Sequence, residues 1–289
     1  MSPVPLYIMY RNNKTGGVFM ARQAKQLIKE FVIEFLAGDW EQFKNFDLNL
    51  LETSEKFGCP GRIFDCDDSN LMRAVYVVLW GKDFPYLNMD NFGFRKQYRG
   101  DTMNTFNTMF GKEIENRPGF FRGSEKYDPS DDFRDKVRQF DKLCRNIGNY
   151  VVLPNYFASR TNLNCYRGTN AWHDFFDRFL IELHKVLTGK ASQDKTLQEL
   201  VKVNNFAFKN FQGEDGFRKF ARILLLDDYC DNSGRPQEIF AMNYHWMNEH
   251  DPKQYFHDAE IYLEKTEKII RSRADKMINL LQENICGAM

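Results

Sequence analysis

Apolar residues that recur every three or four positions are the feature that most constrains how this chain can fold. One run follows Ala21 and places Leu27, Phe31 and Phe35 on one helix face. A second run follows Thr169 and consists of Phe176, Phe179, Leu180, Leu183 and Leu187. Spacings of this kind are typical of amphipathic helices that cover a common core. We therefore predict a mainly α fold, a single globular helical domain with at most a short β element near residues 149–153.

Stop signals and cap residues divide the chain into predicted helices. The segment 65–69 offers cap residues for a helix over 70–80, Asp101 could cap a helix that ends near Phe110, and Asp131 or Asp132 could cap the next. The predicted helices, with approximate bounds, are 21–37, 40–56, 70–80, 101–110, 133–145, 169–187, 196–203, 217–226, 236–248 and 254–283. Residues 20–289 are assigned to the helical domain. Residues 1–19 are interpreted as an extension or an edge strand that need not be native.

Charge and cysteine usage narrow the classes of function. The 289 residues include 40 basic and 40 acidic side chains, so the chain has no net field to attract a polyanion, and binding to nucleic acid would need a local basic patch. The 6 cysteines are scattered without a CxxC pair, which is typical of reduced thiols. No apolar run approaches the ~20 residues of a membrane span. These features predict a cytoplasmic protein that does not associate with membranes.

The candidate site is predicted where two polar segments meet the start of the helix over 169–187. His173 precedes Asp177 by one helical turn, a spacing at which the carboxylate can orient the imidazole for acid-base work, and Arg167 lies just upstream. These three are the candidate catalytic residues. Amides and charged groups suited to a polar or phosphate-bearing ligand flank them. The candidate ligand-binding residues are Asp101, Asn104, Asn107, Asn149, Asn155, Arg160 and Asn164.

Each of these groups also has a purely structural interpretation. His173 and Asp177 could pair for packing, and the asparagines could satisfy the backbone of neighbouring loops. The spacing of Arg167 and His173 is similar to that of HEPN ribonucleases, whose all-helical fold it would imply. The run Asp227-Asp228-x-x-Asp231 has the spacing of magnesium-diphosphate motifs, but it is interpreted as a frayed helix end. No metal site is assigned, because the histidines 245, 250 and 257 lack the one-turn spacing of zinc ligands on a helix.

One stretch carries a local resemblance to a known family. Residues 146–155 read Asn-Ile-Gly-Asn-Tyr-Val-Val-Leu-Pro-Asn, followed by Asn162-Leu-Asn164. This block resembles the Ile-Gly-Asn segment of HNH-type nuclease domains in GmrSD-type restriction enzymes, and the resemblance implies DNA cleavage with one divalent ion. Residues 1–172 contain no histidine, so the upstream catalytic histidine of that family has no counterpart here. The chain as a whole is similar to uncharacterised bacterial helical proteins of a family without an assigned function.

Two functional hypotheses follow from these observations. The first is a non-catalytic cytosolic binding or interaction protein of bacterial type with a polar pocket. The second is a nuclease-like or phosphodiesterase-like enzyme in bacterial defence that acts on nucleic acid or a nucleotide, and only this hypothesis requires a divalent metal as cofactor. The enzyme hypothesis expects His173, Asp177, Arg167 and Asn104 to share an open cleft. The binding hypothesis expects His173 to be sealed in the core and the asparagines all to bond to local backbone. The oligomeric state is left open.

Overall fold

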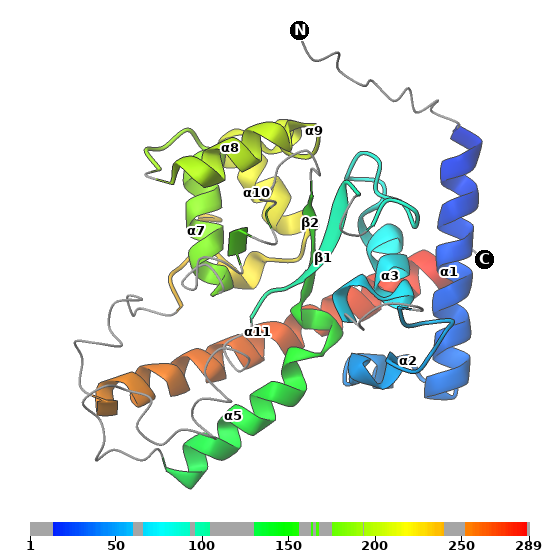
Figure 1. The fold of residues 1–289 in the computed structure, drawn as a ribbon, viewed down its shortest axis with the longest axis horizontal. Helices are drawn as coiled ribbons and strands as arrows, with labels where there is room; N and C mark the ends of the chain where they lie inside the picture. Colours follow the sequence, from blue (N-terminus) through cyan, green and yellow to red (C-terminus); the bar gives the residue numbers. More distant parts are fainter. Residues whose placement is uncertain are drawn as a thin grey trace, which may run out of the picture.

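A computed structural model of the chain describes residues 14–59, 66–92, 96–104, 130–155, 163, 166–167, 175–192, 194–239 and 252–287. The mainly α prediction is confirmed, and Figure 1 shows helices on both sides of a pair of strands. The α-helices are α1 (Lys14–Leu36), α2 (Trp40–Phe43), α3 (Asn70–Trp80), α5 (Asp131–Cys144), α7 (Phe176–Leu187), α8 (Lys195–Val203), α9 (Asn205–Phe208), α10 (Gly213–Ile223) and α11 (Pro252–Cys286). Short 3₁₀ turns are η1 (Leu48–Leu51), η2 (Cys66–Asp68), η4 (Ile147–Asn149), η6 (Lys209–Phe211) and η7 (Asp227–Tyr229).

The strands β1 (Tyr98–Thr102) and β2 (Tyr150–Pro154) form an antiparallel pair at the centre of the molecule. The register places Tyr98 opposite Pro154 and Thr102 opposite Tyr150. Every residue of β2 is buried, which explains why this strand is a continuous apolar run instead of an alternating one. The short β element predicted near 149–153 is therefore confirmed as β2.

Helix α11 connects the parts of the fold (Figure 1). It packs against α2, α3, α5 and η4, and one hydrophobic cluster extends from Ala24 in α1 to Ile285 in α11. The fully buried Arg273 of α11 donates hydrogen bonds to the carbonyl oxygens of Gly148, Tyr150 and Leu224. Burial lowers the pKa of Arg273 to about 10, which leaves the guanidinium charged at neutral pH. Within the described residues, no helix is both long enough and apolar enough to cross a lipid bilayer.

Local cap chemistry explains several helix starts. Ser69 caps α3, because its hydroxyl accepts a hydrogen bond from the backbone nitrogen of Met72 at 3.2 Å. Ser130 caps α5 in the same way through Phe133, so the prediction of Asp131 or Asp132 as the cap is wrong by one or two residues. The two aspartates lie in the first turn, where carboxylates also favour the helix dipole.

Three predicted helices differ in kind from the structure, and the helix predicted over 21–37 begins earlier, at Lys14. Asp101 does not cap a helix, because it lies in β1 opposite Val151. The helix predicted over 40–56 is divided into α2 and η1. Pro236 does not begin a helix, since it forms an isolated bridge with Cys230. The start of the helix predicted over 169–187 lies outside the described residues, and its described part is α7.

Candidate functional site

The two central asparagines of the predicted site bind each other. The side-chain oxygen of Asn149 accepts hydrogen bonds from the backbone nitrogen and the side-chain nitrogen of Asn104, both at 3.0 Å. In return, the side-chain nitrogen of Asn149 donates to the carbonyl oxygens of Asn104 at 3.1 Å and Cys144 at 3.0 Å. Both asparagines are 0% exposed. The hydrogen-bonding groups that were expected to bind a ligand therefore join the end of β1 to η4.

Two tyrosines from the C-terminal half complete the partners of Asn104. Its side-chain nitrogen donates to the Tyr229 hydroxyl at 2.7 Å, and its side-chain oxygen accepts from the Tyr262 hydroxyl at 2.9 Å. Burial raises the pKa of Tyr229, so its hydroxyl stays protonated. With these bonds, both donors of the Asn104 side-chain amide and its oxygen are satisfied inside the protein.

Arg167 is fully buried and forms an ion pair with Asp101 of β1. The guanidinium also donates to the carbonyl oxygens of Thr102 at 3.1 Å and Met103 at 2.8 Å. On its faces it contacts the rings of two phenylalanines of α7, Phe176 and Phe179, at 5.0 and 5.3 Å from the ring centroids. A buried arginine needs this many partners because an uncompensated charge in the interior is costly.

Of the remaining predicted residues, the structure describes only Asp177 and Asn155. Asp177 is 1% exposed and accepts a hydrogen bond from the backbone nitrogen of Ile239 at 2.6 Å. Asn155 is 1% exposed, and its side chain donates to the carbonyl oxygen of Lys96 at 3.3 Å. The other predicted residues, which lie outside the described part of the chain, are Asn107, Arg160, Asn164 and His173.

The structure thus brings Asp101, Asn104, Asn149 and Arg167 together, but inside the fold. We call these four side chains the buried polar network. Its members join β1, η4 and residue 167, and through Tyr229 and Tyr262 they reach η7 and α11. These hydrogen bonds hold together segments that are distant in the sequence, because each of the bonds given above joins two parts of the same chain.

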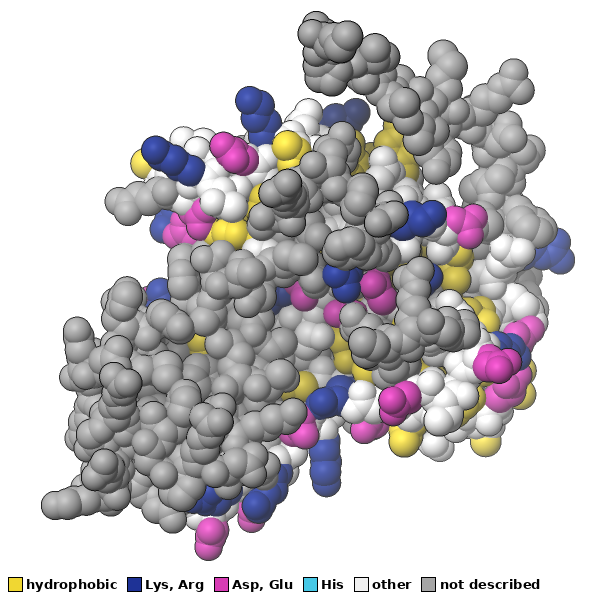
Figure 2. All heavy atoms as spheres, viewed as in Figure 1, with side chains coloured by type: hydrophobic (Ala, Val, Ile, Leu, Met, Phe, Trp, Pro, Cys, Tyr) yellow, Lys and Arg dark blue, Asp and Glu magenta, His cyan; other side chains and the backbone are white. Residues whose placement is uncertain are grey.

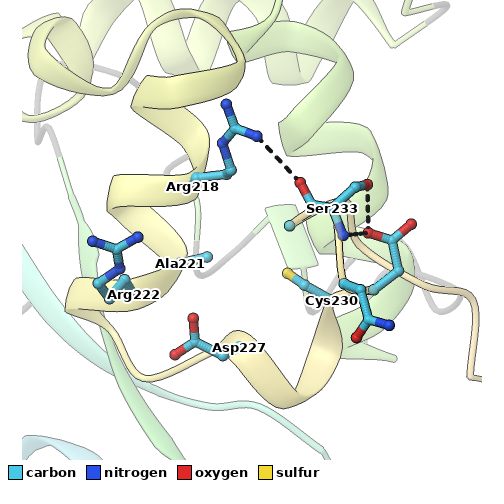
Figure 3. A pocket seen from close by; sticks show the side chains of 9 residues that line it. Arg218, Ala221, Arg222, Asp227, Cys230 and Ser233 are labelled. Carbon is cyan, nitrogen blue, oxygen red and sulfur yellow. Dashed lines mark hydrogen bonds between the residues drawn. The ribbon is translucent and has the colours of Figure 1, made fainter.

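An open pocket lies elsewhere, between α10 and the segment 227–234 (Figure 3). Its volume is about 270 Å³. Helix α10 contributes one wall, and the turn that follows η7 contributes the facing wall, from which the thiol of Cys230 projects toward the helix. The lining residues are Arg218, Ala221, Arg222, Asp227, Cys230, Asp231, Asn232, Ser233 and Gly234.

The turn that forms the second wall is held by Asp231. One of its carboxylate oxygens accepts hydrogen bonds from the backbone nitrogens of Ser233 at 2.8 Å and Arg235 at 3.0 Å, and from the Ser233 hydroxyl at 2.6 Å. The bond from the Ser233 hydroxyl contributes most to lowering the pKa of Asp231. Arg218 joins the two walls, since it pairs with Asp215 and donates to the carbonyl oxygen of Ser233 at 3.4 Å (Figure 3).

The chemistry of the pocket favours binding over nucleophilic attack. Burial raises the pKa of Cys230 to about 12, and the nearby carboxylates of Asp227 and Asp231 add to the shift. A thiol with such a pKa is protonated at neutral pH and is a poor nucleophile. In the ranges that the structure describes, no group of three or more His, Cys, Asp or Glu side chains is placed so that it could hold a metal ion.

Sequence reasoning did not find this pocket, although part of its signal is visible in the sequence. Arg218 and Arg222 are four residues apart and so share a helix face, and the Asp-Asn-Ser-Gly sequence over 231–234 is typical of a turn. The run from Asp227 to Asp231 was interpreted as a frayed helix end. In the structure Asp227 and Asp231 line the pocket, while Asp228 binds Ser272 and Lys276 of α11 at 2.8 and 2.7 Å.

Comparison of the chain with protein-family models, curated proteins and solved structures finds no match. The chemistry of the described residues is therefore the basis for a functional proposal.

Proposed function

We propose that this chain is a non-catalytic binding protein of the bacterial cytoplasm, and that it holds a small polar ligand in the pocket between α10 and residues 227–234. One observation carries the proposal. The side chains of Arg222 and Asp227 line this open pocket, and within the described part of the chain neither forms a hydrogen bond or an ion pair. Charged groups that are exposed in a concave site and not bonded within the protein are available to a ligand.

The buried polar network also favours the hypothesis of a non-catalytic binding protein over that of a nuclease-like enzyme. An enzyme that used Arg167 and Asn104 on a substrate would need them at an open surface, whereas both are 0% exposed. Asp177, proposed as the partner of His173, is 1% exposed and accepts a hydrogen bond from Ile239. The bonds within the protein therefore give Arg167, Asn104 and Asp177 a structural role, and this role requires no catalysed reaction.

The charge distribution agrees with a small ligand in preference to a polyanion. The chain has zero formal net charge, and on the face drawn in Figure 2 the basic and acidic side chains of the described residues alternate over short distances. A nucleic-acid surface depends on many phosphate contacts from clustered lysines and arginines. The scattered cysteines suit the reducing cytoplasm, which we keep as part of the proposal.

The proposal is tested by two assays on the same preparation. In the first, thermal unfolding is followed with a panel of small polar metabolites. We expect at least one of them to raise Tm, since a ligand at 100 times its Kd stabilises a protein by about 2.7 kcal/mol. The matched variant Arg222→Ala should reduce the shift.

In the second assay, RNA, DNA and nucleotides are incubated with the protein and Mg²⁺ or Mn²⁺, beside the variant His173→Ala. We expect no turnover by either protein. Hydrolysis by the wild type that is lost in His173→Ala would instead establish the nuclease or phosphodiesterase hypothesis and overturn the proposed function.

A further inference from the structure

The pocket carries balanced charges, of which only some are used within the protein. Its lining contains two arginines and two aspartates. Arg218 is bound to Asp215 and to the carbonyl oxygen of Ser233, and Asp231 uses one oxygen to hold its turn. What remains for a ligand is a guanidinium at Arg222 and a carboxylate at Asp227, on different parts of the wall (Figure 3).

The guanidinium of Arg222 and the carboxylate of Asp227 together disfavour ligands that carry charges of only one sign. A phosphate or a simple carboxylate would be attracted by Arg222, but it would also approach the carboxylates of Asp227 and Asp231. A simple amine would be attracted by Asp227 and Asp231, but it would leave the guanidinium of Arg222 without a partner. Like charges brought together in a partly desolvated site weaken binding. A ligand with one cationic and one anionic group meets an opposite charge at both places.

The size and the remaining lining restrict the ligand further. The volume of about 270 Å³ lies slightly below the ~300–1,000 Å³ of pockets that take drug-sized molecules. Ala221, which is 3% exposed, and the neutral thiol of Cys230 provide an apolar strip between the polar groups. The strip suits a short side chain attached near both charges.

We propose that the pocket binds a free α-amino acid, with Arg222 contacting the α-carboxylate and Asp227 contacting the α-ammonium group. A guanidinium presents paired donors that match the two oxygens of a carboxylate, and a carboxylate accepts from an ammonium group. This inference rests on the proposed function, because it assigns a ligand class to the same pocket.

The ligand class is tested by isothermal titration calorimetry with a panel of the common L-amino acids. For any amino acid that binds, two analogues are compared with it. The N-acetyl derivative lacks the ammonium charge, and the amide derivative lacks the carboxylate. We expect each analogue to bind at least about tenfold more weakly, since hydrogen bonds to charged groups contribute enough to affinity to account for such a factor.

Two pocket variants and one control locate the binding. Arg222→Ala and Asp227→Asn should each weaken amino-acid binding by about tenfold or more. Lys219→Ala removes a cation from the exposed face of the same helix outside the pocket lining, and it should leave the affinity unchanged. All three positions are exposed, so unchanged circular dichroism and urea midpoints are expected for every variant.

The other outcomes separate the two proposals. If inorganic phosphate or the N-acetyl derivative binds as tightly as the amino acid and Asp227→Asn has no effect, the pocket is an anion site, so the ligand class is wrong while the proposed function stands. If amino acids bind but neither pocket variant matters, the assignment to this pocket is wrong. If nothing in either panel binds, both proposals are overturned.

Discussion

The side-chain oxygen of Asn149 accepts hydrogen bonds from both the backbone and the side-chain nitrogen of Asn104, 45 residues away in the sequence. The pairing is reciprocal, because the side-chain nitrogen of Asn149 donates to the carbonyl oxygen of Asn104. This relationship replaces the ligand contacts that the sequence suggested for these two residues. The contribution of these hydrogen bonds to the free energy of unfolding can be measured by substitution.

Asn149→Asp should destabilise the protein strongly although it hardly changes the side-chain shape. The new carboxylate cannot donate to the carbonyl oxygens of Asn104 and Cys144, which the amide binds in the wild type. Because buried groups left unsatisfied cost about 1–3 kcal/mol each, we expect the free energy of unfolding to fall by ~3 kcal/mol or more in urea titrations. The exposed Asn45→Asp serves as the control and should change it by less than ~0.5 kcal/mol. A similar small effect at both positions would contradict the described geometry.

Arg167→Met should destabilise the protein, and a second substitution, Asp101→Asn, should partly reverse that loss. The single change leaves Asp101 as a buried carboxylate without its ion-pair partner, which typically costs ~3–5 kcal/mol. Adding Asp101→Asn removes that charge, so the double variant should be more stable than the sum of the two single effects predicts. The exposed pair Arg138–Asp135 offers a matched cycle, in which the coupling should be below ~1 kcal/mol. Additive effects at positions 101 and 167 would show that the pair is not coupled.

Gly148→Ala should disturb the contact between η4 and α11. An added Cβ would lie 2.0 Å from the carbonyl oxygen of Ile270 and 2.8 Å from the backbone nitrogen of Ala274, so the helix would have to move. We expect a loss of about 3 kcal/mol in unfolding free energy, as for strongly overpacked sites. Gly189→Ala is the comparison, because that residue has a φ of +70° with nothing within 4 Å of the added atom. It should lose only ~1 kcal/mol, the cost of the left-handed conformation. Equal losses at both sites would contradict a close approach at Gly148.

Glu214→Gln should remove a stabilisation that the wild type has at neutral pH and loses at acidic pH. Glu214 of α10 binds Lys190 at 2.6 Å and His184 of α7 at 2.8 Å, and these bonds lower the pKa of its carboxyl from 4.5 to about 2. Because the folded-state pKa is depressed, the stabilisation is fully present above pH 4.5 and is lost as the pH falls toward 2. Urea titrations between pH 7 and pH 2 should therefore show the wild type and Glu214→Gln converging as the pH falls through this range. Wild-type and Glu214→Gln curves that stay parallel would contradict the shift.

The helices with strong periodicity and clear caps were predictable, because both signals are local. The prediction for α3 over 70–80 agrees with the structure, and so does its cap in the segment 65–69, since Ser69 lies directly before the apolar run. Helix α8 was predicted over 196–203 and is found over Lys195–Val203. In both cases the residues that decide the structure are neighbours in the sequence.

The errors have a common physical origin in contacts between distant segments. Asp101 was predicted to cap a helix because an aspartate before an amphipathic run is a typical start signal. Its observed partners are Val151 across the sheet and the Arg167 guanidinium, 66 residues away, and no local pattern encodes either one. The pocket was missed for the same reason, since Asp227 becomes a wall residue only when the turn after η7 folds back against α10.

The Ile-Gly-Asn block shows how a sequence motif can have a packing explanation. Ile147 is a fully buried core residue, Gly148 allows α11 to approach, and Asn149 binds Asn104. Each of the three residue types is therefore accounted for by contacts within this fold. The resemblance to nuclease domains is not needed to explain them.

The side chain of Asn104 also has a consequence for how the protein opens. It bonds to residues that lie 45, 125 and 158 positions away, so four segments of the chain share a single amide. Each of the three partner segments can separate from Asn104 only by breaking a buried hydrogen bond. Backbone amide hydrogens around Asn149, Tyr229 and Tyr262 should consequently exchange with solvent at one common slow rate, that of global unfolding, and not at separate local rates.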